Sequence, residues 1–327
     1  MLAAKAEWSY TEYALSWLHG ARMLLQTGTT TVADIEAVPE LLPEIWDATP
    51  LRVFSFLEMT GVRSRRLPSE ILQQAVDKCN SLAHPRCRTA LSPHAPYSTS
   101  LELLRLCSET AREKPFLVAT HVAESIQEFD MFSHARGEMF QWLLRNGRNM
   151  EDCGLGSAVR HMDRAGLLGE HFIGVHLNCL APGDAELLGH RRAHVVHCPR
   201  SHEYFRHPPF PRQPLADAGV NLCLGTDSLA TVRRIEKEEI ELDLFAEMRA
   251  FSRAHRVPAE TILQMVTLGG ARALNMAGQI GELSENAFAD LIAIPFAGKK
   301  ADIFEAVLHH PSTVSASMIN GRWAIAP

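Results

Sequence analysis

Short, uninterrupted apolar runs recur along the chain, and segments with apolar residues at helical spacing separate them. Strands that are buried on both faces of a parallel sheet have such continuous runs instead of alternating ones. The runs predict seven strands, at residues 30–35, 52–57, 88–91, 116–120, 172–175, 193–196 and 221–224. The intervening helices are predicted at residues 12–26, 69–82, 99–113, 181–189, 214–218 and 236–251. This alternation of strand and helix predicts an α/β fold on a parallel sheet.

The number and order of these units favour an incomplete barrel. Seven strand–helix units are one short of the eight that close a (β/α)8 TIM-type barrel. The helix predicted at 12–26 precedes the first recognisable strand, although a helix in this repeat normally follows one. We therefore expect a barrel that lacks its first strand, which would lie ahead of Met1.

Two regions depart from the repeat. Residues 125–169 form a longer connection, with helices predicted at 129–144 and 159–168 around a loop at 146–156, and long insertions of this kind often cover an active site. After a long helix predicted at 258–276 come short β segments with an Asn320-Gly321 dipeptide, which is typical of a tight hairpin. We expect an incomplete hydrolase barrel over 1–278 and a small β portion over 279–327.

Composition narrows the class of protein. A chain of 327 residues with 46% hydrophobic residues can form one large barrel core. The net charge of −6 and the absence of a basic run argue against nucleic acid or an anionic membrane as a partner. No apolar stretch reaches the length of a membrane span. Seven scattered cysteines without a C-x-x-C pair indicate a reducing compartment, so we expect a cytoplasmic protein with a small-molecule substrate. The sequence does not decide whether the protein forms a homo-oligomer.

Polar residues that suit metal-assisted hydrolysis follow three of the predicted strands. His121 and Glu124 follow the strand at 116–120, His176 follows the next, and Asp227 follows the run that ends at Leu224. Each alone has a structural explanation, such as a core histidine or a helix cap. Because the carboxyl ends of barrel strands meet at one rim, the ordered set favours a catalytic site there.

Two further loops are candidates for substrate contact. The prolines of Pro93-His94-Ala95-Pro96-Tyr97 make a rigid loop that would hold His94 and Tyr97 over the barrel mouth, although a simple strand–helix turn would also explain it. The segment from His197 to His202 has no structural zinc spacing. We expect a loop there that places Arg200 or His202 on a substrate.

As an ordered set, these segments resemble the amidohydrolase superfamily, in its deaminase and chlorohydrolase branch. The matching segments are residues 27–34, 92–97, 121–125, 175–176, 224–227 and 281–294. The resemblance implies a (β/α)8 barrel with a small β-sandwich built from both termini. It also implies one divalent metal, zinc or alternatively iron.

The resemblance also assigns roles to individual residues. His121 would be a metal ligand, and Asp227 a ligand and the base for the bound water. Glu124 would carry the proton to a ring nitrogen and to the leaving group. His176 would contact the water or the oxyanion, and His94 the substrate.

One element of the family pattern is missing. The family's first strand carries a His-x-His pair that supplies two more metal ligands, and none of the 16 histidines here are spaced two apart. Two of four protein ligands do not fix a catalytic metal. The chain is therefore expected to be truncated at its start or, as the less favoured alternative, to be an inactive remnant or an interaction subunit.

The function implied by the resemblance is hydrolytic deamination of an aminated purine or pyrimidine base or nucleoside-like compound. An aminofutalosine deaminase-like enzyme is an alternative, because Arg200-Ser201-His202 departs from the usual Ser-Asn at that place. A chlorohydrolase or amide hydrolase could use the same residues. A phosphate-binding barrel would need Gly-rich loops after the last two strands, and only Gly225 is found there.

Overall fold

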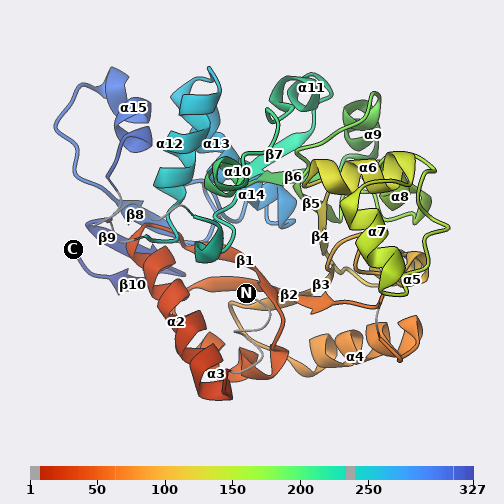
Figure 1. Cartoon of the computed structure of the whole chain (residues 1–327). Helices are drawn as coiled ribbons and strands as arrows, with labels where there is room; N and C mark the ends of the chain where they lie inside the picture. Colours follow the sequence, from red (N-terminus) through yellow and green to blue (C-terminus); the bar gives the residue numbers. More distant parts are fainter. Residues whose placement is uncertain (1–7, 63, 233–239, 312) are drawn as a thin grey trace.

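The computed structural model describes residues 8–62, 64–232, 240–311 and 313–327. A seven-stranded parallel sheet, in the order β1 to β7, forms its centre. Helices cover the outside of this curled sheet (Figure 1). The strands are β1 Thr31–Glu36, β2 Arg52–Met59, β3 Arg88–Pro93, β4 Val118–Val122, β5 Phe172–His176, β6 His194–His197 and β7 Asn221–Leu224. All seven predicted strands are confirmed, and β1 and β7 are the sheet's edges within the described ranges.

The fourth strand lies two residues later in the chain than predicted. Val118 of β4 pairs with Phe172 of β5, and His121 pairs with Val175. His121 is therefore inside a strand instead of just beyond it. A polar histidine in an apolar run looks like the end of a strand when only the sequence is considered.

A three-stranded antiparallel sheet lies near the C-terminus, as the β segments predicted. It contains β8 Leu291–Ala293, β9 Ala316–Ile319 and β10 Arg322–Ile325. Asn320 and Gly321 connect β9 to β10 with φ of 51° and 75°, which confirms the hairpin. The buried Arg52 of β2 binds the carboxylate of Asp290 at 3.1 Å, and this ion pair joins the two sheets.

The helices follow the predicted alternation, with several added or divided elements. Before β4 they are α2 Tyr10–Gln26, α3 Leu42–Asp47, α4 Pro68–Ser81 and α5 Leu101–Glu113. After β4 they are α6 Ile126–His134, α7 Glu138–Arg145, α8 Ala158–Arg164, α9 Asp184–Arg191, α10 Pro199–Phe205, α11 Arg212–Asp217, α12 Leu244–Ala254, α13 Ala259–Val266, α14 Leu268–Ala273 and α15 Ile303–Leu308. Short 3-10 helices occur at Pro39–Leu41, Leu229–Thr231 and Lys300–Asp302.

Three helix predictions need correction. The helix predicted at 129–144 is divided because Ala135 adopts a left-handed conformation, with φ of 49°. The one predicted at 258–276 is divided at Thr267, whose φ and ψ are −119° and −88°. The one predicted at 236–251 begins only at Leu244 in the described residues, where Asp243 caps it, and residues 236–239 lie outside them. The described helices are all too short or too polar to traverse a bilayer.

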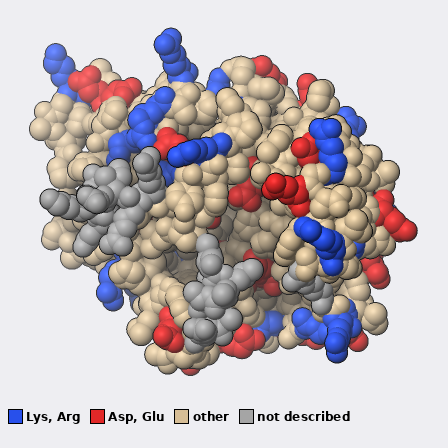
Figure 2. All heavy atoms as spheres, viewed as in Figure 1, with Lys and Arg blue, Asp and Glu red and all other residues tan. Residues whose placement is uncertain are grey.

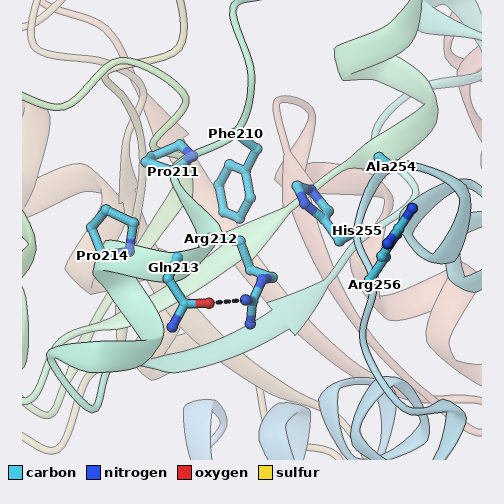
Figure 3. Close-up of a pocket in the computed structure, with 8 residues that line it drawn as sticks. All are labelled: Phe210, Pro211, Arg212, Gln213, Pro214, Ala254, His255 and Arg256. Atoms are coloured by element: carbon cyan, nitrogen blue, oxygen red, sulfur yellow. Dashed lines mark hydrogen bonds between the residues drawn. The ribbon is translucent and has the colours of Figure 1, made fainter.

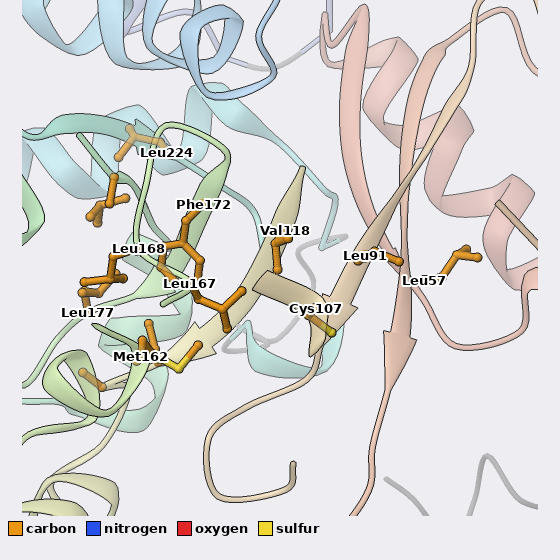
Figure 4. Close-up of a cluster of buried hydrophobic side chains, with 14 of the residues drawn as sticks. Leu57, Leu91, Cys107, Val118, Met162, Leu167, Leu168, Phe172, Leu177 and Leu224 are labelled. Carbon is orange, nitrogen blue, oxygen red and sulfur yellow. The ribbon is translucent and has the colours of Figure 1, made fainter. Parts of the chain in front are cut away.

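The core has two layers. One fills the space between the sheet and its helices and includes Leu57, Leu91, Cys107, Phe172 and Leu224 (Figure 4). The second lies inside the curled sheet, where strand residues pack against the segment that follows α13. Its members are Phe54, Phe56, Ala90, Leu117, Ala119, Ile173, Cys223, Ala271, Ala273, Leu274, Met276 and Ile280.

The space around two helical glycines shows how closely the outer helices pack. A Cβ at Gly189 of α9 would lie 2.1 Å from the carbonyl oxygen of Ala218, whereas a Cβ at Gly270 of α14 would meet nothing within 4 Å. We expect Gly189→Ala to lower the free energy of unfolding by about 1–3 kcal/mol. Gly270→Ala should raise it by about 0.5–1 kcal/mol, because alanine favours the helix. Urea unfolding measures the free energy of unfolding of both variants. Equal changes in the two variants would contradict the close contact between Gly189 and Ala218.

Candidate active site

Three histidines lie in a row across neighbouring strands. His94 directly follows β3, His121 belongs to β4, and His176 ends β5. The ring centroids of His94 and His121 are 5.1 Å apart, and those of His121 and His176 are 5.6 Å apart. The His94 carbonyl oxygen lies 3.0 Å from Nδ1 of His121, so this contact leaves Nε2 of His121 available. The parallel sheet thus brings together three residues that are far apart in the sequence.

Glu124 lies beside this row. Its Oε1 is 3.7 Å from Nε2 of His176 and 4.0 Å from Nε2 of His207. Glu128, one helical turn later, accepts hydrogen bonds from the backbone N–H groups of Ala123 at 3.0 Å and Glu124 at 2.9 Å. The buried Glu128 carboxyl group therefore fixes the backbone that presents the Glu124 side chain.

Asp227 reaches the site from the loop after β7. Its Oδ2 accepts a hydrogen bond of 2.6 Å from the hydroxyl of Ser201 on α10, and its Oδ1 accepts one from the N–H of Ser228. Its negative charge opposes the effect of burial on the pKa of His176. Ser201 thus orients the Asp227 carboxylate beyond the carboxyl end of β7.

The backbone around these residues is strained. Ala123, His176, Leu177 and Asp227 all have positive φ, at 53°, 78°, 50° and 52°. A non-glycine residue in this region costs roughly 1–2 kcal/mol, and such strain tends to concentrate at functional sites. The amide of Leu177 donates to Val122 and that of Cys179 to Ala123, and these bonds hold the strained turns in place.

Burial controls the protonation of the site. It lowers the pKa of His94 and of His121, and it lowers that of His176 to about 4. It raises the pKa of the Glu124 carboxyl group. The imidazoles are therefore neutral near pH 7, and the carboxyl group retains its proton to a higher pH than an exposed one. Neutral imidazoles beside a carboxyl group of raised pKa suit general acid–base chemistry.

The site does not by itself fit a metal ion. Over the described ranges, no three His, Cys, Asp or Glu side chains are arranged so that they could hold one. His121 and Asp227 would be two ligands, and a catalytic zinc needs at least three from the protein.

Of the other predicted residues, Tyr97 and His202 face neighbouring rings. Tyr97 contacts His94 edge-on, with centroids 5.9 Å apart, and burial raises the pKa of its hydroxyl group. Nδ1 of His202 lies 3.1 Å from Oδ1 of Asn178, whose amide donates to the carbonyl oxygen of Glu124.

The loop predicted around Arg200 is instead helix α10. The Arg200 side chain turns to α12, where its Nε donates to the buried Glu247 at 2.5 Å and its Nη2 donates to the carbonyl oxygen of Glu241. Proline at the first position of α10 favours this helix. Arg200 thus joins α10, which carries Ser201, to α12.

Sequence reasoning missed three residues of the site, namely Glu128, Ser201 and His207. Glu128 follows Glu124 by four residues and could have been placed on the same helical side. Nothing in the local sequence indicates that His207 returns to Glu124, because that approach depends on how the segment after α10 folds back.

The surface of the molecule is hollowed in more than one place. Figure 2 shows a hollow near the centre of the displayed face, with carboxylate groups beside it. A separate cavity of about 350 Å³ lies between the start of α11 and the end of α12, and Phe210, Arg212 and His255 are among its lining residues (Figure 3). None of the predicted site residues lines that cavity.

The family model for amidohydrolases, described as "Amidohydrolase family", matches residues 11–324. The chain belongs to the amidohydrolase family. It is 36% identical over 250 residues to the 5-methylthioadenosine/S-adenosylhomocysteine deaminase of Syntrophobacter fumaroxidans, which covers 69% of this chain and 51% of that protein. The chain thus spans about half the length of this relative.

Solved structures show the same fold at lower identity. An adenosine deaminase from Xanthomonas campestris with bound zinc has a TM-score of 0.82 and 23% identity, over 98% of this chain and 71% of that one. The aminofutalosine deaminase of Helicobacter pylori has a TM-score of 0.80 and 22% identity, over 95% and 77%. These likenesses confirm the predicted TIM-like barrel architecture.

Proposed function

We propose that this amidohydrolase catalyses the hydrolytic deamination of a nucleoside-like compound with an amino group on its purine ring. The observation that carries the proposal is the position of the Glu124 carboxyl group, 3.7 Å from Nε2 of His176 at the ends of adjacent strands, where burial raises the pKa of that carboxyl group. The similarity to a deaminase of methylthioadenosine and S-adenosylhomocysteine supports this substrate class.

The chain's own residues account for the proton transfers. Glu124 donates a proton to the ring nitrogen beside the carbon that bears the amino group, which makes that carbon electrophilic. The oxygen of a water molecule then bonds to this carbon, and Asp227 takes the water's proton. Nε2 of His176 donates a hydrogen bond to the new oxygen. Finally the C–N bond breaks and the nitrogen takes the proton held by Asp227 and leaves as ammonia. The new hydroxyl group gives its proton back to Glu124, which leaves a carbonyl group on the ring and restores the acid.

We propose His121 and Asp227 as two ligands of a divalent metal, zinc in the first place and iron as the alternative. The described residues supply too few ligands to fix an ion by themselves. Further ligands would have to come from outside the described residues. The buried free cysteines are compatible with a reducing cytoplasm.

We assign substrate contact to His94, Tyr97 and His202. Their rings adjoin the histidine row or the Asn178 amide that binds Glu124. Arg200 is given a different role, because its guanidinium group is engaged by Glu247. It would hold α10, and with it Ser201, in place against the Asp227 carboxylate.

One experiment separates this function from its alternatives. The chain as given and a version extended upstream by the in-frame genomic sequence are each purified, loaded with zinc and analysed for bound metal. Both are then assayed for ammonia release from adenosine, 5′-methylthioadenosine, guanine and cytosine, and for chloride release from a chlorinated triazine. We expect the extended version to bind zinc and to favour the adenine nucleosides. If it binds no metal and releases no ammonia, a non-catalytic interaction subunit is the better account. Activity on chlorinated triazines alone would indicate a chlorohydrolase.

A further inference from the structure

A buried arginine in the long connection after β4 binds the loop that carries two of the site's residues. Arg148 lies between α7 and α8 and is only 5% exposed. Its Nη2 donates to the carbonyl oxygen of Pro96 at 3.1 Å, and its Nε donates to that of Tyr97, also at 3.1 Å. The guanidinium group therefore satisfies two consecutive carbonyl groups about 50 residues away in the sequence.

The loop that it holds is the one between β3 and α5. His94 and Tyr97 project from this loop, and its backbone also carries the carbonyl oxygen that contacts His121. Within the loop, the amides of Ser98 and Thr99 both donate to the carbonyl oxygen of Ala95. These short-range bonds define the turn, while Arg148 fixes the turn to the body of the protein.

The charge of Arg148 is balanced locally. Its Nη1 and Nη2 donate to the two carboxylate oxygens of Asp152 at 2.7 and 2.8 Å. Burial opposes ionisation of Asp152, but the Arg148 hydrogen bonds outweigh it and lower the pKa of that carboxyl group. The fork of two parallel bonds fixes the plane of the guanidinium group, and a lysine cannot reproduce this geometry.

We propose that Arg148 is a positioning residue of the candidate active site, which sets the place of His94 and Tyr97 through the backbone of residues 96–97. The connection between β4 and β5 then acts on a part of the site outside its own strands. It determines the geometry of a substrate-contacting loop from a different part of the sheet. The catalytic consequence rests on the proposed function, whereas the structural consequence does not.

Hydrogen–deuterium exchange tests the structural consequence directly. In Arg148→Met, the amides of residues 94, 95 and 97–99 should exchange at least about tenfold faster than in the parent chain, because the turn loses its attachment. Arg148→Lys should give an intermediate rate. The matched control is Arg136→Met, since Arg136 lies in the same connection but makes an exposed ion pair with Asp130. Unchanged exchange at 94–99, with faster exchange only at residues 146–153, would overturn the proposal.

A second variant covers the case in which Arg148→Met does not fold. Asp152→Asn retains the size of the partner and weakens the fork, so it should accelerate exchange at 94–99 in the same direction by a smaller factor. If it leaves those amides unchanged, the attachment does not depend on this pair, and the proposal fails.

Kinetics test the catalytic consequence in the extended, zinc-loaded protein. We expect Arg148→Met to lower kcat/KM for deamination by about 10–100-fold, with bound zinc unchanged and with partial recovery in Arg148→Lys. A purely structural role would lower Tm and leave kcat/KM of the folded fraction intact. If the parent protein releases no ammonia, the proposed function fails, and the exchange experiment still decides the role of Arg148.

Discussion

Replacing Glu124 with glutamine should lower kcat for deamination by about 10³-fold, because the amide retains the shape of the side chain but cannot deliver a proton. In the proposed mechanism Glu124 is the acid of the site. It lies 3.7 Å from His176, and burial raises the pKa of its carboxyl group. Steady-state ammonia release by the extended, zinc-loaded protein measures the loss.

The control for this substitution is Glu138→Gln in the first turn of α7, which should retain parental activity. Tm of both variants should match that of the parent, since glutamine retains the size of the glutamate side chain at both positions. A Glu124→Gln enzyme that retained a tenth or more of the parental kcat would remove Glu124 from the proton transfers.

The free energy of unfolding should fall steeply as the pH drops below about 6.5, the usual pKa of an unfolded histidine. Burial lowers the pKa of His161 to about 4 and that of His197 to about 2. Between these values and pH 6.5 the unfolded chain binds more protons than the folded one, so acid favours unfolding. The stabilisation from the two neutral histidines is complete above pH 6.5. Below that pH, they together lower the free energy of unfolding by on the order of 2 kcal/mol per pH unit.

Urea unfolding at pH 7.0, 6.0 and 5.0 measures this slope. His197→Phe should remove about half of the slope that the two histidines contribute, because phenylalanine binds no proton. The His197 ring stacks on Phe210 with centroids 3.8 Å apart, and phenylalanine can retain that contact. The control is His309→Gln at an exposed position, which should leave the slope unchanged. An unaltered slope in His197→Phe would show that His197 is accessible to protons in the folded protein.

The sheet could be predicted from the sequence because each strand is a short apolar run that needs burial on both faces. The same rule misplaced β4 by two residues, since His121 interrupts the apolar pattern without ending the strand. The division after α6 has a local signal in Gly137, which precedes α7 with φ of 97°. The break at Thr267 contains neither glycine nor proline, so the local sequence gives no sign of it.

The site was predictable to the extent that strand ends define it. His94, His121 and His176 follow from the order of the parallel strands. The contacts that orient these residues could not be deduced, because Arg148 reaches residues 96–97 and Ser201 reaches Asp227 across long stretches of sequence. Arg200 shows that a candidate residue can also have a structural role. The sequence predicted that this charged residue contacts the substrate, whereas it binds Glu247 inside the fold.

Ammonia release from 5′-methylthioadenosine by the extended, zinc-loaded protein tests the central claim most directly, namely that the carboxyl ends of these strands form a deaminase site. We expect one molecule of ammonia for each nucleoside consumed, with the inosine analogue as the other product. A folded, zinc-containing protein that releases no ammonia from this or any other aminopurine nucleoside would contradict it.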